Sequence, residues 1–227
     1  MFRIIAVALL IVAQSAFAAP QKLTAVYHVT QNGLPFADVT ETFRQEGGHY
    51  TVESVTAGIG IYALFGKRRL YSEGEVTAEG LRPAHFELQQ GDNVKKAVSA
   101  DFDWTGKTVA LKAKGQMTKE PLEVGTQDLA SYAYQFMFVP PKGDDVVLSV
   151  TTGKQQRVYH YRITERDVNV ETAAGKFKAE HLVNAKENGE EKELWLGAEA
   201  HHIPVRILMR DDKGAKIEQV LTSLHGE

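Results

Sequence analysis

Apolar and polar residues alternate along most of the chain with a period of two. The first clear case is the stretch 23–30, in which every odd-numbered residue is apolar. Because successive side chains of a β-strand point to opposite faces, this alternation predicts a strand with one buried face. Asn32-Gly33 follows, and this dipeptide favours a two-residue hairpin turn. We therefore expect a meander that continues through strands at 36–44 and 50–56, with a turn at Glu46-Gly47-Gly48 between them.

Turn-forming residues recur about every 8 to 12 residues through the rest of the chain, which is typical of all-β sandwiches and barrels. The further strands expected from this pattern span residues 70–76, 82–88, 94–102, 107–113, 146–150, 159–163, 168–171, 177–183, 194–196, 203–209 and 215–224. Turns are expected at 91–93 and at Asn188-Gly189, and the charged run 190–193 is expected to be solvated. Residues 114–125 are expected to form a polar connection without a strand.

One segment, residues 127–138, has helical spacing instead. Its apolar residues at positions i, i+3, i+4, i+7 and i+8 are Leu129, Tyr132, Ala133, Phe136 and Met137. This spacing puts them on one face of a short helix, which Thr126 or Asp128 can cap and Pro140-Pro141 ends. The sequence therefore predicts an all-β fold, a strongly curved antiparallel sheet or incomplete β-barrel of about a dozen strands, with one short helix packed on it.

Residues 58–66 form a continuous apolar stretch that glycines interrupt and bracket, and Lys67-Arg68-Arg69 follows it. Its local structure is expected to be a short helix or a mobile loop. Two interpretations of its role remain open. The segment is either a buried crossover inside the core or a flexible flap over an apolar site.

The N-terminus has the features of a secretory signal peptide. Arg3 is followed by an uncharged apolar run over 4–13 and by the small-residue site Ala16-Phe17-Ala18, which predicts cleavage after Ala18. The alternative is an uncleaved anchor, but the apolar run is shorter than the roughly 20 residues that a membrane span needs. The chain has no cysteine, so it can form no disulfide and carry no thiol-linked lipid anchor. We expect a soluble protein of the bacterial periplasm.

Removal of the predicted signal peptide 1–18 leaves residues 19–227, a length that suits one β-rich domain. The net charge of the whole chain is −3, and loss of Arg3 makes it one unit more negative. This mild acidity gives no reason to expect nucleic acid as a partner. No window after residue 18 is apolar enough for a transmembrane helix. A transmembrane outer-membrane β-barrel is the less favoured alternative, because segments such as 68–73 carry charges on both faces.

Residues that catalysis or metal binding would need are not grouped in the sequence. There is no cysteine and no Gly-x-Ser-x-Gly nucleophile motif. Ser131 and Asp128 are close enough to touch on a helix, but no histidine is near them in sequence, so Asp128 is interpreted as a capping residue. His201-His202 would point to opposite faces of an extended segment, and no His-x-His pair offers metal-ligand spacing. We predict no enzyme activity, no metal and no cofactor.

Several short motifs follow one another along the chain. They are Asn32-Gly33, Gly80-Leu-Arg-Pro83, Phe102-Asp-Trp104, Gln127-Asp-Leu-Ala-Ser-Tyr-Ala-Tyr134, Trp195-Leu196 and Pro204-Val-Arg-Ile207. In this order and spacing, over nearly all of residues 19–227, the chain resembles the secreted bacterial family catalogued as domain of unknown function 3108 (DUF3108). That family has no established activity, so the resemblance implies secretion and a fold but no catalytic residue. Its curved sheet with a helix against the concave side is similar to the periplasmic lipoprotein carriers, and fold alone does not fix function.

Aromatic residues are the remaining indication of function. Tyr134 and Phe138 make the expected helix apolar on more than one side, and such a helix is buried on several sides or faces an apolar ligand. Our hypothesis is that the concave side of the sheet binds a lipid or another apolar molecule, with the helix and residues 58–66 as covers. The residues expected to line this site are Tyr62, Phe65, Arg68, Arg69, Tyr132, Tyr134, Phe136, Phe138 and Trp195. The alternative is an envelope protein that acts through protein contacts, with the aromatic residues filling an ordinary core.

Overall fold

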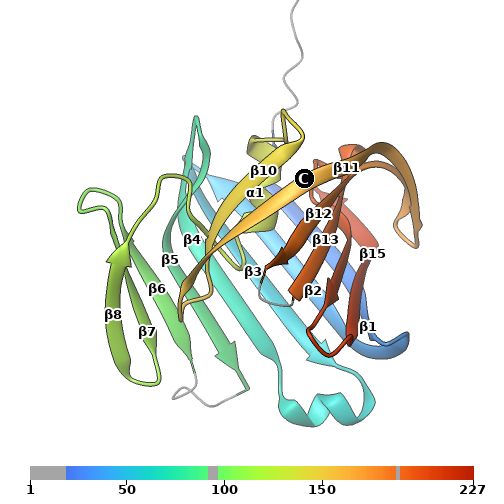
Figure 1. Ribbon diagram of the computed structural model, residues 1–227, viewed down its shortest axis with the longest axis horizontal. Coiled ribbons are helices and arrows are strands. Elements are labelled where there is room, and N and C mark those ends of the chain that lie inside the picture. The colour runs from blue at the N-terminus through green and yellow to red at the C-terminus, as the bar shows by residue number, and fades with distance from the viewer. Residues whose placement is uncertain (1–18, 92–96, 188–189) are drawn as a thin grey trace, which may run out of the picture.

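The structure is a computed structural model that describes residues 19–91, 97–187 and 190–227. Within these residues the chain forms one sheet of fifteen strands and one α-helix, with short 3-10 helices (Figure 1). The predicted all-β fold, a strongly curved antiparallel sheet with one short helix packed on it, is confirmed. The predicted signal peptide 1–18 and the predicted turn Asn188-Gly189 lie outside the described residues, as does most of the predicted turn 91–93.

The sheet is a long meander whose first and last strands pair in its middle. Its strands are β1 (Lys22–Gln31), β2 (Leu34–Glu46), β3 (His49–Gly58), β4 (Arg68–Thr77), β5 (Gly80–Gln90), β6 (Val98–Asp103), β7 (Thr108–Ala113), β8 (Gln116–Pro121), β9 (Gln127–Asp128), β10 (Asp145–Thr151), β11 (Gln156–Thr172), β12 (Gly175–Glu187), β13 (Glu190–Gly197), β14 (Pro204–Arg210) and β15 (Lys216–Gly226). They lie in the order β8-β7-β6-β5-β4-β3-β2-β1-β15-β14-β13-β12-β11-β10-β9. The pairing of β9 with β10 is parallel, and the other pairings are antiparallel. Antiparallel neighbours need only short turns, so local turn signals predicted most of this topology.

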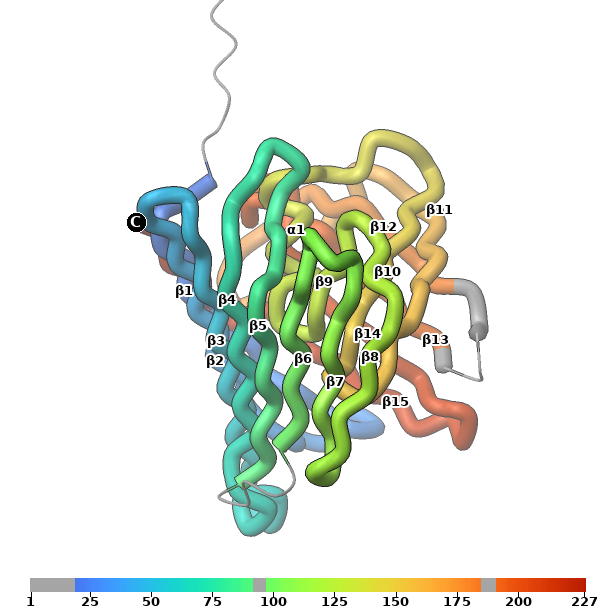
Figure 2. Tube along the Cα trace, turned by 90° about the vertical axis from the view of Figure 1, so that its left-hand side faces the viewer, coloured from blue at the N-terminus to red at the C-terminus, as the bar shows by residue number. Residues whose placement is uncertain are grey.

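The sheet curves until its two halves face each other across a common core (Figures 1 and 2). In β1 the odd-numbered residues from 23 to 29 are the buried ones, as the alternation predicted. Large buried side chains in the first half include Phe43, Tyr50 and Phe86, and Leu194 is buried in the second half. Because the sheet is curved, the inner faces of its two halves pack against each other, and no second sheet is needed to cover them.

The helix α1 spans Tyr132–Phe138 and lies inside the concavity (Figure 1). Its residues from Tyr132 to Phe136 are buried, and the Tyr134 ring stacks on Phe43 with 5.5 Å between the ring centroids. The helix is therefore buried on several sides by protein. No helix in the described part of the chain is long and apolar enough to cross a membrane.

The helix begins later than the predicted range 127–138. Residues Gln127–Asp128 form β9 and pair with β10, and Ser131 is the residue before the helix, without a side-chain cap. The expected capping by Thr126 or Asp128 is therefore wrong. Instead, Asp128 Oδ1 accepts the backbone N–H groups of Ala130 and Ser131 at 2.8 and 2.9 Å, in a turn that precedes the helix. Sheet pairing and this turn outcompete the first helical turn, because both satisfy backbone groups that are buried here.

Two glutamines, Gln127 in β9 and Gln135 in α1, connect the helical segment to the β4–β5 turn in the first half of the sheet. Gln127 Nε2 donates to the Leu81 carbonyl at 2.8 Å, and the Leu81 N–H donates to Gln135 Oε1 at 2.6 Å. Gln135 Nε2 also donates to the Glu79 carbonyl at 3.0 Å. Gly80 lies between these contacts with φ +98°, and a Cβ at this position would collide with the Gln135 amide. These contacts, which we call the glutamine clamp, thus join two sequence motifs that are far apart in the chain.

Two segments differ from the strands that the sequence predicted. Residues 114–125, expected to lack a strand, contain β8, whose side chains are mostly exposed and so show no apolar alternation. The separate strands expected at 159–163 and 168–171 are parts of the single strand β11. Its pairing with β12 shifts register around Glu165, and this irregularity interrupts the alternation that sequence analysis relies on.

The Gly-bracketed segment 58–66 forms the 3-10 helix η1 (Gly60–Phe65), which has no buried residue. Ile61, Leu64 and Phe65 are 71, 84 and 70% exposed, so the interpretation of this segment as a buried crossover is wrong. A Cβ at Gly58 would collide with the backbone of Tyr62, so glycine is what allows η1 to fold back against β3. Both views place η1 at the opposite end of the strands from α1 (Figures 1 and 2).

Candidate functional site

An open pocket of 760 Å³ lies where η1 approaches the strand ends of the first half of the sheet. Its lining residues are Gln31, Phe36, Ala37, Thr56, Gly58, Tyr62, Phe65, Gly66, Arg68, Gln90 and Gly91. Phe36 and Tyr62 form its aromatic wall, with 4.6 Å between their ring centroids. We call this cavity the η1 pocket. Its volume falls within the range of roughly 300 to 1,000 Å³ that is usual for small-molecule sites.

A smaller cavity of 180 Å³ lies deeper in the concavity, beside the start of α1. Its lining residues are Tyr27, Val39, Glu41, Ser54, Arg68, Leu70, Leu129, Ala130, Tyr132, Ala133, Lys192, Pro204, Ile207, Met209 and Gln219. We call this cavity the inner chamber, and both halves of the sheet contribute to it. Arg68 lines both cavities, so they adjoin at its side chain. The combined site therefore runs from an apolar mouth at η1 to a polar end near α1.

Glu41 and Arg68 are two of the charged side chains that line the inner chamber. Glu41 accepts hydrogen bonds from the hydroxyls of Ser54 and Tyr134, both at 3.1 Å. Burial raises the pKa of Glu41, and these two hydrogen bonds offset part of the rise. Burial lowers the pKa of Arg68, but a guanidinium stays protonated in proteins. Among the described residues Arg68 has neither a hydrogen-bond partner nor an ion-pair partner.

Lys192 enters the inner chamber from β13, on the other half of the sheet. Its Nζ donates to the Tyr132 hydroxyl at 2.8 Å and lies 4.2 Å from the centre of the Tyr132 ring. Burial acts to lower the pKa of Lys192 and the Tyr132 phenol acts to raise it, with the balance upward, so the amine is charged at neutral pH. In the described chain no carboxylate pairs with Lys192. The expectation that the run 190–193 is solvated is therefore wrong for Lys192, which strand alternation turns inward.

The structure brings together some of the residues predicted to line a ligand site. Tyr62, Phe65 and Arg68 line the η1 pocket, and Tyr132 lines the inner chamber beside Arg68. These four residues come from η1, β4 and α1, and the helical spacing that singled out Tyr132 gave no indication that Arg68 would be its neighbour.

The other residues predicted for the site lie elsewhere. Tyr134 and Phe136 are 1 and 2% exposed and fill the core, and Phe138 packs on Phe43 with 5.9 Å between ring centroids. Arg69 is exposed on the convex face of β4, where it pairs with Glu53.

Trp195 was also predicted for the site, but it lies on the opposite face of β13 from Lys192. There its ring stacks on that of His181, with 4.2 Å between centroids, and the Arg206 guanidinium lies 4.5 Å from the ring centre. Aromatic content does not tell which face of a strand a side chain occupies, whereas the alternation relative to Leu194 does.

Sequence reasoning missed Phe36, Glu41 and Lys192 as site residues. A usable signal existed for the two charged residues. Glu41 lies between Val39 and Phe43 on the alternation that marks the buried face of β2, and Lys192 has the same relation to Leu194. A charged residue at a core-facing position is rarely left without a partner or a function, so it indicates a site inside the fold.

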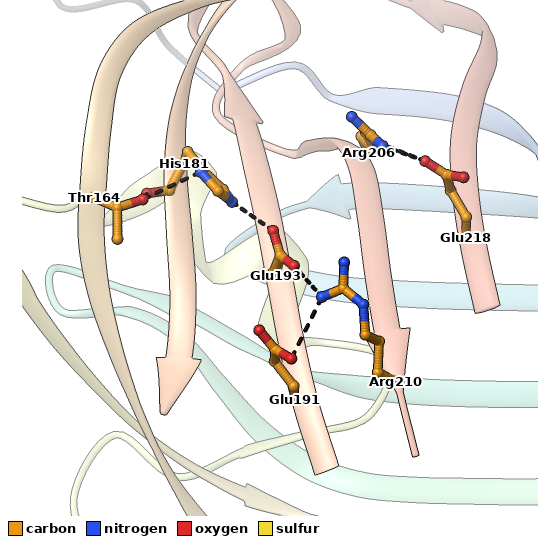
Figure 3. Close-up of polar contacts among 7 residues, drawn as sticks. All are labelled: Thr164, His181, Glu191, Glu193, Arg206, Arg210 and Glu218. Atoms are coloured by element: carbon orange, nitrogen blue, oxygen red, sulfur yellow. Dashed lines mark hydrogen bonds and ion pairs between the residues drawn. The ribbon is translucent and has the colours of Figure 1, made fainter. Parts of the chain in front are cut away.

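The convex face of the second half carries a network of paired charges (Figure 3). His181 Nε2 lies 2.8 Å from Glu193, and the Arg210 guanidinium lies 2.6 Å from Glu193 and 3.4 Å from Glu191. Arg206 forms a further ion pair with Glu218 across β14 and β15. Because each of these charges already has a partner, we interpret the network as cross-strand pairs that stabilise the sheet.

Histidines do not form a metal site in the described part of the chain. Within it, no three His, Asp or Glu side chains are grouped so that they could hold a metal ion. His201 and His202 both have positive φ, 54° and 59°, in the turn between β13 and β14. The two residues are thus not in an extended segment, because the 3-10 helix Ala198–Ala200 turns the chain at this point.

Asp128 is a buried carboxylate in a polar network outside both cavities. Its Oδ2 accepts a 2.6 Å hydrogen bond from the Ser72 hydroxyl, which in turn lies 3.0 Å from the Tyr50 hydroxyl. Burial raises the pKa of Asp128 to about 6, although the hydrogen bonds from Ser72 and the backbone oppose this rise. A carboxyl whose pKa is higher in the folded than in the unfolded protein favours folding only while it is protonated.

We expect stability to fall as the pH rises through Asp128 titration, and Asp128→Asn to remove that part of the fall. The contribution is fully present below about pH 4 and is lost through about pH 6, which amounts to about 3 kcal/mol at roughly 1.4 kcal/mol per pKa unit. Asparagine can keep the contacts, because its oxygen accepts the two backbone N–H groups and its amide donates to Ser72. Urea denaturation at pH 4, 5, 6 and 7 gives the free energy of unfolding of the wild-type protein and of Asp128→Asn. The same pH dependence of that free energy in both proteins would contradict the assignment to Asp128.

The fold and the site define a class of protein, a curved antiparallel sheet that encloses a short helix and a cavity leading from apolar to charged walls. The chain belongs to the family described as protein of unknown function (DUF3108), whose profile matches residues 26–222, so the resemblance found in the sequence is confirmed. No curated protein matches the chain. The matched range begins in β1 and ends in β15, so it includes every residue that lines the two cavities.

Proposed function

We propose that this protein binds a lipid or a similar apolar small molecule, and that it does so without converting it chemically. The observation that carries the proposal is the η1 pocket, a 760 Å³ cavity with the side chains of Phe36, Tyr62 and Phe65 in its wall. Phe65 is 70% exposed, so the wall presents apolar surface that a ligand would remove from water. Burial yields about 0.8 kcal/mol per CH₂, so a 14-carbon chain gains on the order of 11 kcal/mol before the costs of association.

We propose η1 as the movable cover of this pocket. Its Ile61, Leu64 and Phe65 side chains are exposed, and Gly58 and Gly66 flank it. Opening would break the contact of Tyr62 with Phe36 and the 3.1 Å hydrogen bond from Gln90 Nε2 to the Phe65 carbonyl. The helix α1 was the other expected cover, but its Gln135 is held by the Leu81 and Glu79 backbone, and the helix is buried in the core. The proposal therefore assigns opening to η1 and leaves α1 fixed.

We propose the periplasm as the place of this function. The support is the signal-peptide pattern of residues 1–18, with its small-residue site before Ala19, and the absence of cysteine from the sequence. Cell fractionation and N-terminal sequencing test it. The expected result is a soluble periplasmic protein that begins near Ala19, and recovery only with detergent-solubilised membranes would contradict it.

The binding proposal predicts that the protein carries an acyl molecule when it is purified from its native compartment. The test is extraction of the purified protein with organic solvent, followed by mass spectrometry of the extract. A stoichiometric acyl species is the expected result. An empty extract, together with no binding of fluorescent fatty-acid probes, would favour the alternative of an envelope protein that uses the exposed Ile61, Leu64 and Phe65 in protein contacts.

A further inference from the structure

The inner chamber holds more positive than negative charge, and the positive groups are unpaired. Arg68 and Lys192 both line it, and within the described chain neither forms an ion pair with a carboxylate. The carboxylate of Glu41 lines the same chamber, but its hydrogen bonds come from Ser54 and Tyr134. Charged side chains that are withdrawn from water are almost always paired, because an isolated charge in such a place is costly. Two unpaired cations at one cavity therefore indicate an anionic partner from outside the chain.

Arg68 connects the positive charge of the inner chamber to the η1 pocket, the proposed lipid site. Arg68 lines both the η1 pocket and the inner chamber, so a molecule lying along the combined site passes its guanidinium. The apolar wall lies on the η1 side of Arg68, and Lys192 with Tyr132 lies on the other side. An amphiphile fits this arrangement in one direction, with its charged head inward and its tail toward η1.

The size of the inner chamber limits the head group. Its 180 Å³ is about a quarter of the 760 Å³ of the η1 pocket, so the polar end is the narrow part of the combined site. A carboxylate or a single phosphate fits that space, and both accept hydrogen bonds from a guanidinium and an ammonium.

We propose that Arg68 and Lys192 form an anion subsite that selects single-chain amphiphiles with a compact anionic head, and that these bind head-first. This inference rests on the proposed function, because it assigns the substrate class and orientation for the same site. Arg68 and Lys192 act as binding residues here. Tyr132 acts as a positioning residue, because its hydroxyl and ring hold the Lys192 amine in the chamber.

The test compares four ligands of equal chain length on the full chain by isothermal titration calorimetry, below their aggregation concentrations. They are tetradecanoate, tetradecyl phosphate, tetradecanol and tetradecyltrimethylammonium. We expect at least one of the two anions to bind tenfold or more tightly than tetradecanol, and which anion does so identifies the head. Equal affinity for anion and alcohol, or a preference for the cation, would overturn the anion subsite while leaving the binding function intact. Binding of none of the four would overturn both.

Three variants assign the effect to residues. Arg68→Met and Lys192→Met should each weaken binding of the preferred anion at least tenfold and lower the ratio of anion affinity to tetradecanol affinity. Both should stay folded, because each residue is only partly buried and an apolar side chain of similar length replaces a charge that has no ion-pair partner in the described chain. Arg69→Met is the matched control, since Arg69 is the next residue but lies on the convex face and pairs with Glu53. An equal loss in Arg69→Met, or unchanged anion binding in both chamber variants, would contradict the assignment.

Discussion

Replacing Phe136 with aspartate is expected to unfold the protein, whereas the same replacement of Phe65 is expected to leave it folded and to abolish binding of an acyl chain. Phe136 is 2% exposed in the core around α1, and Phe65 is 70% exposed at the η1 pocket. Removing a buried phenylalanine costs about 3 to 5 kcal/mol, and burying a carboxylate there adds to that cost. The sum approaches the whole stability of a typical domain, which is about 5 to 15 kcal/mol.

The aspartate at position 65 acts on the ligand and leaves the core untouched. Its side chain stands in water in the free protein, so the free energy of unfolding should change by less than about 1 kcal/mol. In the complex the carboxylate would be forced against a hydrocarbon chain, which opposes binding by several kcal/mol. Circular dichroism with urea denaturation measures the fold, and solvent extraction with mass spectrometry measures the bound acyl species.

Leu64→Asp is the matched control for this pair of variants. Leu64 is the neighbour of Phe65 in η1 and is 84% exposed, but it does not line the pocket. We expect this control to fold and to retain the acyl species. A folded Phe136→Asp protein would contradict the placement of α1 in the core. Retention of ligand by Phe65→Asp would exclude the η1 pocket as the site.

Replacing Gln135 with alanine is expected to destabilise the protein by about 1 to 3 kcal/mol. The change leaves the buried Leu81 N–H without an acceptor, which costs about 1 to 3 kcal/mol, whereas the carbonyl of the exposed Glu79 can bond to water instead. The higher helix propensity of alanine offsets only a few tenths of a kcal/mol. This loss of stability comes from a single side chain because Gln135 directly links α1 to the β4–β5 turn.

Urea denaturation measures this prediction, with Gln116→Ala as the control. Gln116 is an exposed residue of the edge strand β8, so its replacement should change the free energy of unfolding by less than about 0.5 kcal/mol. Gly80→Ala should resemble Gln135→Ala, because the added Cβ would displace the same amide and because φ at this residue is +98°. Equal stability of the Gln135 and Gln116 variants would show that the clamp contributes nothing.

Local patterns were sufficient for most of the strands and turns. Each hairpin is built from neighbours in sequence, so its alternation and its turn residues are both contained in one short window. Asn32-Gly33 shows this directly, because both residues adopt the positive φ that a tight hairpin turn requires, 52° and 81°. Where the prediction failed, a longer-range contact had won. Residues Gln127–Asp128 pair with β10 instead of starting the helix, and the exposed edge strand β8 lacks a buried face to reveal it.

The candidate site was predictable only in part, for the same reason. Spacing and composition singled out Tyr62, Phe65, Arg68 and Tyr132, but they gave equal weight to Trp195, which lies on the other face of the sheet. Which side chains meet depends on how far the sheet curves and on the register that places Lys192 opposite Arg68 across the concavity.

By itself the sequence determined the class of fold, most of the strands, the one short helix and the family, because these follow from alternation, turn chemistry and motif order within short windows. Only the tertiary structure decided that η1 is exposed, that α1 is fixed by Gln127 and Gln135, and that Arg68 and Lys192 share a chamber. These contacts join residues far apart in the chain. Their energies depend on burial and distance, which no local pattern of residues encodes.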